Sequence, residues 1–179
     1  MYDLPRARQA GLAALIVVLA AGCTTSQATN VGAIPVVDHQ SFVGGCAGTT
    51  LTDADPPAWA QAGWTVVKGA PWPVPWAAGT HGDFVAFLFA TELVAGPSPR
   101  VDGSDNKVLW VTKDFPPFGN ATIEGRPLGR SQPVVTIADG PSVVDLPQAG
   151  CWTFRPSWTA KGRPISSINL EVLPAGTPP

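Results

Sequence analysis

From about residue 64 onward, hydrophobic residues fall in short runs rich in β-branched and aromatic side chains, separated by glycine, proline, aspartate or asparagine. Such runs are typical of β-strands, and turn residues at this spacing favour many short strands. The predicted strands are 64–67, 83–90, 107–112, 121–125, 133–138, 151–154 and 165–173. This pattern indicates an all-β fold, an immunoglobulin-like β-sandwich.

The run "KVLWVT" (107–112) shows the alternation most clearly. Successive side chains of a strand point to opposite faces, so Trp110 and Leu109 lie on different faces of the sheet. We expect Trp110 to be a core residue. An immunoglobulin domain proper also has a tyrosine corner, but the one tyrosine here is Tyr2, so the likeness is to the architecture alone.

One short helix is predicted in "AWAQAG" (58–63). Asp55 would cap it, two prolines would occupy its first turn, and Gly63 would end it. Trp59 is expected to face the core from this helix. The 20 prolines and 19 glycines among 179 residues, with charged residues at 13%, argue against longer helices.

The N-terminus has a different pattern. Two arginines precede the apolar run "GLAALIVVLAAG" (11–22), which is shorter than the about 20 apolar residues that cross a bilayer. A basic segment, an apolar segment and small residues predict a secretory signal peptide over 1–22. The small residues lead directly into Cys23, and "LAAGC" resembles the lipobox of bacterial lipoproteins, with Leu19 one place earlier than in the commonest pattern.

The lipobox resemblance implies that Cys23 receives a diacylglycerol thioether and, as in other lipoproteins, further acylation such as palmitate. The protein would then be held at the extracytoplasmic face of the cell membrane. Residues 23–42 are expected to form the lipidated N-terminus and a flexible tether, and 43–175 the β-sandwich domain. Two alternatives stay open: Cys23 has no role in an ordinary secretory signal, and "AIPVV" (33–37) forms a first edge strand.

If Cys23 carries lipid, two cysteines remain, Cys46 and Cys151. An exported chain meets oxidising conditions, so an even pair of cysteines indicates one disulfide. We expect Trp152 to pack near it. The alternative is a free structural or reactive thiol at Cys151, which would need a base or cation beside it, and no histidine is near it in the sequence.

Charge and residue types exclude several classes of function. Removal of 1–22 takes the basic residues from 11 to 9 and the acidic residues from 13 to 12, so the net charge is near −3 and no basic patch is left for nucleic acid. The two histidines lack the H-x-x-H or C-x-x-C spacing of a zinc site. "DGSDN" (102–106) lacks the spacing and glutamate of an EF-hand. No metal or cofactor is expected.

Two stretches are candidates for function. In "APWPVPWAAG" (70–79), prolines stiffen a loop that carries Trp72 and Trp76. These rings would form a platform for a polysaccharide or an envelope protein, or alternatively cover an open end of the sandwich. In "HGD", His81 and Asp83 are the best local acid–base pair, but the chain has no G-x-S-x-G, and the alternative is a turn entering a strand.

The segments "PPAWAQAGW", "GDFVAFLFATELVAG", "NKVLWVTK" and "GPSVVDLPQAGCWTF" together resemble a group of uncharacterised exported or membrane-anchored proteins of actinobacteria and related bacteria. The resemblance covers about 56–173. After Phe154, "RPSWTAKGRP" is a longer connection than the tight turn usual in that group. The group has no established activity, so the resemblance implies an architecture and no catalytic residue.

Two classes of function follow from the sequence. The first is a non-catalytic binding or structural protein of the cell envelope, anchored through lipid on Cys23, with an envelope protein or polysaccharide as its partner. The second is an envelope hydrolase that uses His81 and Asp83 with an unidentified nucleophile.

Overall fold

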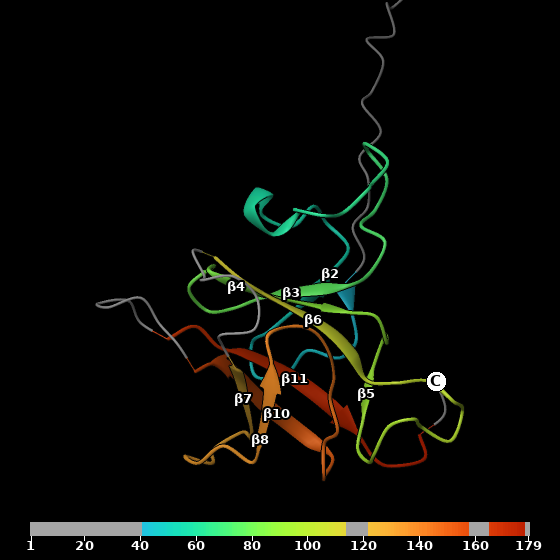
Figure 1. Ribbon diagram of the computed structural model, residues 1–179, viewed down its shortest axis with the longest axis vertical. Helices are drawn as coiled ribbons and strands as arrows, with labels where there is room; N and C mark the ends of the chain where they lie inside the picture. The colour runs from blue at the N-terminus through green and yellow to red at the C-terminus, as the bar shows by residue number, and fades with distance from the viewer. Residues whose placement is uncertain (1–40, 114–121, 158–164, 178–179) are drawn as a thin grey trace, which may run out of the picture. The chain divides into compact units, whose positions relative to one another are not determined.

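The computed structural model describes residues 41–113, 122–157 and 165–177, and in these residues the chain is almost entirely β-structure. Two sheets pack against each other, as Figure 1 shows, which confirms the predicted all-β sandwich with little helix. The elements are β1 (Ser41–Phe42), β2 (Leu51–Thr52), η1 (Ala58–Ala60), β3 (Trp76–Ala78), β4 (Phe84–Leu88), β5 (Leu93–Val94), β6 (Lys107–Thr112), β7 (Thr122–Pro127), β8 (Val135–Ala138), β9 (Gly140–Val143), β10 (Gly150–Pro156) and β11 (Ile168–Leu173).

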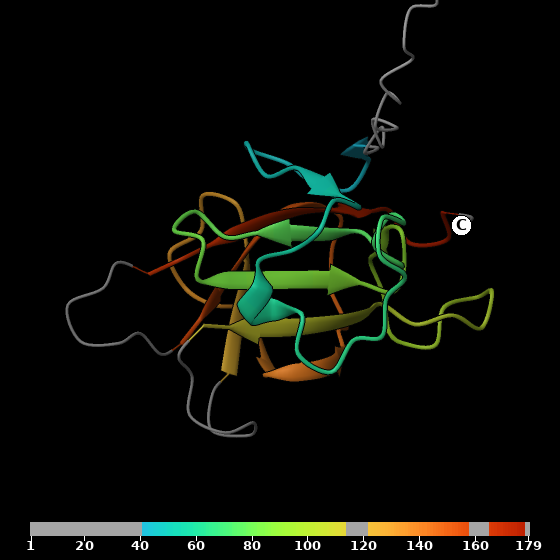
Figure 2. The same ribbon diagram turned by 90° about the horizontal axis from the view of Figure 1, so that it is seen from above.

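The first sheet has the strand order β1-β2-β3-β4-β6-β9, and the second has the order β5-β11-β10-β7-β8. Neighbouring strands are antiparallel except β5 and β11, which run parallel. Figure 2 shows β3, β4 and β6 side by side, with the helical turn η1 over them. The first sheet therefore has an inner face toward the second sheet and an outer face toward η1.

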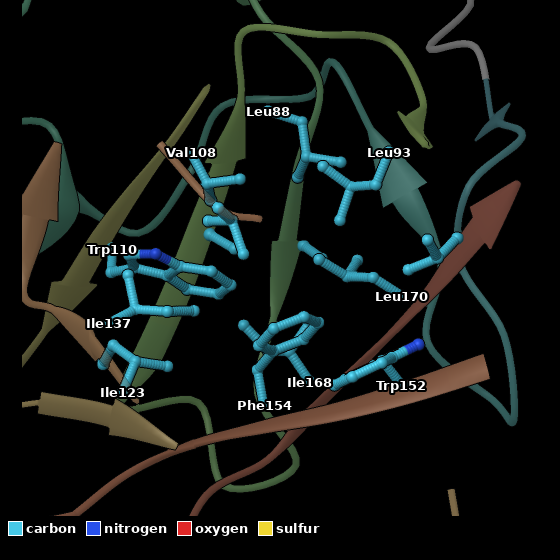
Figure 3. Close-up of a cluster of buried hydrophobic side chains, with 14 of the residues drawn as sticks. Leu88, Leu93, Val108, Trp110, Ile123, Ile137, Trp152, Phe154, Ile168 and Leu170 are labelled. Atoms are coloured by element: carbon cyan, nitrogen blue, oxygen red, sulfur yellow. The ribbon is translucent and has the colours of Figure 1, made fainter. Parts of the chain in front are cut away.

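The core lies between the sheets and is built from alternate residues of their strands. In β6, Val108 and Trp110 are buried among the inner residues, while Leu109 contacts the outer face, as the alternation predicted. In β10, Trp152 and Phe154 point inward, and the ring centroids of Trp110 and Phe154 are 5.1 Å apart across the two layers. Figure 3 shows these side chains converging from both sheets. Removing this apolar surface from water is the main stabilising contribution to the fold.

The strand predicted at 64–67 does not form, so this prediction is wrong. The ring of Trp64 contacts Phe87 and Phe89 of the first sheet, at centroid distances of 5.0 and 6.0 Å. Val66 and Val67 lie in an exposed loop and pair with no strand. The β-branched residues of this run thus have no neighbouring strand to complete a sheet.

The strand β3 lies within the stretch that was interpreted as a stiff proline-rich loop. The three prolines all precede it, so every residue of β3 keeps its backbone N–H. β3 pairs with β4, with Trp76 opposite Phe87 and Ala78 opposite Val85. The proline-rich stretch is therefore a loop only as far as Pro75.

The helix predicted at 58–63 is a single 3-10 turn, η1, and Asp55 does not cap it. Pro57 stands at the N-cap position and offers no side-chain hydrogen bond to the turn. Trp59 is half-buried against the outer face of the first sheet, so it does not face the core between the sheets as predicted.

β1 begins at Ser41, so the sheet includes the last two residues of the predicted tether, 23–42. The predicted signal peptide 1–22, Cys23 and the alternative strand 33–37 lie outside the described residues, as does much of the long connection after Phe154. Within the described parts of the chain, no helix has the length and apolar character to cross a membrane.

Candidate functional site

Cys46 and Cys151 form a disulfide, as predicted, with a Cα–Cα distance of 5.9 Å and a sequence separation of 105 residues. The backbone N–H of Cys46 also donates a hydrogen bond to the carbonyl of Asn169 in β11, at 3.2 Å. Cys151 lies in β10, where the alternation of the strand directs Trp152 into the core and Cys151 to the opposite face. The bond therefore joins the N-terminal segment to the second sheet, and neither sulfur is a free thiol.

A second hydrophobic cluster covers the outer face of the first sheet. Its aromatic members come mainly from the segment between β2 and β3, which includes η1 and lies over β4. We call it the outer aromatic cluster, and it includes Trp59, Trp64, Trp72, Trp76, Val85 and Phe87.

Trp72 and Trp76 belong to this cluster and do not form an exposed platform, so the predicted platform is wrong. Trp72 is 4% exposed and Trp76 is 8% exposed. Pro71 and Pro73, on either side of Trp72, are exposed. The ring of Trp72 points the other way and stacks on Phe87. The indole Nε1 of Trp76 donates to the carbonyl of Ala54 at 2.6 Å. The two rings cover the face of the first sheet and offer no surface for stacking a sugar.

His81 and Asp83 do not assemble a catalytic site among the described residues. The His81 side chain is exposed, and the contact of this residue with Ser166 is made by its backbone N–H, which donates to the Ser166 Oγ at 3.2 Å. Gly82 N–H donates to the carbonyl of Gly79, which forms a turn directly before β4, as the alternative interpretation expected. A serine hydrolase needs the imidazole itself to reach the serine hydroxyl, and this geometry does not provide it.

A cavity of about 390 Å³ lies where the loop after β5 meets the segment after β11. Its walls are formed by 94–97, 99–102 and 175–177, and most of this lining is apolar. The N–H of Ala95 bonds to the carbonyl of Leu173 at 2.9 Å, which holds the two segments together. The sequence pattern did not indicate a cavity here, because only "DGSDN" (102–106) was considered in this loop, as a calcium site that its spacing excluded.

Arg100 is the positively charged residue of the cavity wall, and its guanidinium is held in place by the protein. Nε donates to Asn106 Oδ1 at 3.0 Å, and Nη2 donates to Asn106 Oδ1 and to the carbonyl of Glu92. Among the described residues, no group accepts a hydrogen bond from Nη1. The side chain is therefore fixed in orientation while two of its N–H donors stay available.

Asn106 fixes this arrangement from a buried position, with 1% of its surface exposed. Its amide donates to the carbonyls of Val94 and Val144 at 2.7 and 3.0 Å, and its Oδ1 also accepts from the N–H of Val94 at 3.0 Å. In the sequence, Asn106 is only the residue before the predicted strand 107–112. Its hydrogen bonds join Val94, Arg100 and Val144, and Val144 is distant from it in the sequence.

Asp102 is the acidic residue of the cavity wall. Its Oδ1 accepts hydrogen bonds from the hydroxyl and the N–H of Ser104, at 2.7 and 2.9 Å. These bonds, with a smaller contribution from the charge of Arg100, hold the pKa of Asp102 below its ordinary value. Within the described residues Asp102 forms no ion pair with Arg100, so the Arg100 charge has no paired carboxylate.

Comparisons with models of protein families, with curated proteins and with solved structures found no match. The resemblance to exported actinobacterial proteins therefore stays a prediction. No group of three or more histidine, cysteine, aspartate or glutamate side chains within the described residues is placed to hold a metal ion.

Proposed function

We propose that this protein is a lipid-anchored, non-catalytic binding protein of the cell envelope. Its ligand carries a carboxylate on an apolar body and binds in the cavity beside Arg100. The observation that carries this proposal is a fixed arginine with available N–H donors on the wall of a mostly apolar cavity, whose one carboxylate, Asp102, is hydrogen-bonded to Ser104.

The size and lining of the cavity support a small ligand. Binding sites for small molecules are concave, about 300–1,000 Å³ in volume, and lined mainly by apolar groups with a few fixed polar ones. Here prolines and aliphatic side chains form most of the walls, Arg100 supplies the fixed positive group, and Asp102 is the acidic group. A guanidinium is weakly hydrated and matches a carboxylate in shape, and because Asn106 already orders it, little side-chain entropy is lost on binding.

Two observations support a location outside the cytoplasm. A disulfide such as Cys46–Cys151 persists in oxidising compartments. The pattern "LAAGC" after a short apolar run would supply both export and lipidation. Attachment to the membrane surface would keep the cavity in the envelope, where peptides and other small carboxylates pass.

Binding to the cavity is tested with matched pairs of small ligands, for example octanoate and octanamide, or a short apolar peptide with a free or an amidated C-terminus. We expect the carboxylates to bind more tightly than their amides by roughly tenfold or more, because a hydrogen bond to a charged group contributes about 1.5–3 kcal/mol. Isothermal calorimetry measures the difference on the unmodified protein. Equal affinities of acid and amide, or no binding of either, would contradict the proposal.

The contribution of Arg100 is tested separately. Arg100→Gln should remove the preference for the acid over the amide, while Arg130→Gln, at an exposed arginine in the β7–β8 connection, should leave it unchanged. The unfolding temperatures of both variants show whether the fold around Asn106 is kept after the substitution. If the Arg100→Gln protein is folded and still binds the acid more tightly than the amide, a group other than Arg100 recognises the carboxylate.

Membrane attachment is tested at Cys23. Two acyl chains hold a protein stably to a bilayer, whereas one does so only marginally. We therefore expect Cys23→Ser to release the protein from the membrane fraction or to block its maturation. Detergent phase separation of wild-type and variant cell extracts measures this. A mature wild-type protein found wholly in the aqueous phase would contradict lipidation.

A further inference from the structure

The loop 64–70 presents apolar side chains to solvent beside the outer aromatic cluster. All its residues after Trp64 are exposed, and the side chains of Val66 and Val67 are 42% and 76% exposed. The N–H of Ala70 donates to the carbonyl of Val67 at 3.1 Å, which closes a turn at the tip. Gly69, with a φ of +80°, supplies the left-handed conformation that this turn requires. The loop thus holds Val67 and Lys68 at its tip.

Phe89 extends this apolar surface from the end of β4. Its side chain is 45% exposed and stacks on Trp64, with ring centroids 6.0 Å apart and an interplanar angle of 13°. The Nζ of Lys107 lies 5.3 Å from the centroid of the Phe89 ring. We call the surface formed by Trp64, Val66, Val67, Lys68, Phe89 and Lys107 the interfacial face.

The interfacial face packs against buried aromatic rings of the outer aromatic cluster. Trp64 packs against Phe87 and Trp72 at centroid distances of 5.0 and 5.5 Å, and both of these residues are buried. Because Trp64 is fixed on buried rings, the exposed ring of Phe89 stacked on it is ordered before any partner arrives. Little conformational entropy is then lost when another surface covers the face.

We infer that the interfacial face contacts the headgroup region of a membrane that contains anionic phospholipid. Tryptophan, phenylalanine and aliphatic residues with lysines at the edge are the composition that partitions into the bilayer interface. Both charged members of the face are lysines, although the whole chain has a net charge of −2, so the local charge complements an anionic surface. The inference rests on the proposed attachment through Cys23, which would bring the face near a bilayer.

The test places a polarity-sensitive fluorophore on the face of the full-length protein reconstituted in vesicles. Val67→Cys carries the label, and Val134→Cys, at a valine 50% exposed directly before β8 and outside the cavity, is the matched control. Cys46 and Cys151 are unreactive in the disulfide. The parent protein, labelled in parallel, reports any label taken up by Cys23, so a failure of the lipid anchor is seen separately from a failure of the face.

In vesicles of phosphatidylcholine with phosphatidylglycerol, we expect the label at position 67 to shift to the blue and to be quenched by spin-labelled lipid, and the label at position 134 to do neither. Lys68→Gln and Lys107→Gln, which each remove one positive charge, should each weaken the contact roughly fivefold, because one lysine near an anionic surface contributes about that factor. Equal signals at positions 67 and 134 would overturn the inference. So would a shift at position 67 that appears without lipid and grows with protein concentration, since a second copy of the chain would then cover the face.

Discussion

Replacing Cys46 and Cys151 with serine together is expected to lower the free energy of unfolding by about 4–5 kcal/mol. The bond spans 105 residues, so it encloses most of the described sandwich, and its removal returns that loop's conformational entropy to the unfolded chain. The folded state keeps other contacts of the same segment, including the hydrogen bond from Glu171 N–H to the Gly44 carbonyl at 2.7 Å. The loss should therefore appear as reduced stability of an intact fold.

Urea denaturation of the oxidised wild-type protein and of the double variant measures this difference. Wild-type protein with reductant should behave as the double variant does, and the double variant itself should not respond to reductant. The double variant is preferred to a single substitution because it leaves no lone thiol. Equal stability of the two proteins would show that the bond does not restrict the unfolded chain.

The sequence identified strands whose burial alternates, such as β7, β10 and β11, and also β4, whose continuous apolar run is buried at every position. In β6 the inner positions can be read from the alternation, because Val108 and Trp110 are buried between the sheets while Leu109 and Val111, on the outer face, are only partly buried against the outer aromatic cluster. The disulfide was also predictable, since it depends on the number of cysteines and the compartment rather than on the path of the chain.

Elements that depend on distant contacts were not predictable. The run 64–67 has the residues of a strand, but the Trp64 ring packs on Phe87 and no strand lies beside it. β1, β2 and β5 have two residues each, too few for any period to be visible. Local propensity is a weak guide wherever tertiary packing decides the outcome.

The candidate site was missed for a similar reason. Arg100 stands in a loop of prolines and glycines, where an arginine is ordinarily a solvated surface residue. Its fixed orientation comes from Asn106 and from the carbonyl of Glu92, which reach it only after β5 and β6 have paired with their neighbours. The sequence did indicate Trp72 and Trp76, but proline spacing alone could not tell whether the rings face solvent or the sheet.

Truncation of either tryptophan is expected to destabilise the protein strongly. Trp72→Ala and Trp76→Ala should each lower the free energy of unfolding by about 3–5 kcal/mol, because each removes a buried indole and leaves a cavity over Phe87. A surface platform would show almost no loss. Thermal and urea unfolding of the two variants measure the effect, with Trp59→Ala, at a half-buried ring of the same cluster, as the smaller loss for comparison.

Phenylalanine at the same positions separates packing from hydrogen bonding. Both substitutions remove a similar ring volume, but Trp76 Nε1 donates to the Ala54 carbonyl at 2.6 Å, whereas Trp72 Nε1 is buried with no partner among the described residues. Trp76→Phe should therefore cost about 1 kcal/mol more than Trp72→Phe, since it breaks a hydrogen bond and the other substitution removes an unsatisfied donor. A larger loss of stability in Trp72→Phe than in Trp76→Phe would contradict this expectation. It would mean that the packing of the Trp72 ring contributes more to the stability of the outer aromatic cluster than the hydrogen bond from Trp76 to Ala54 does.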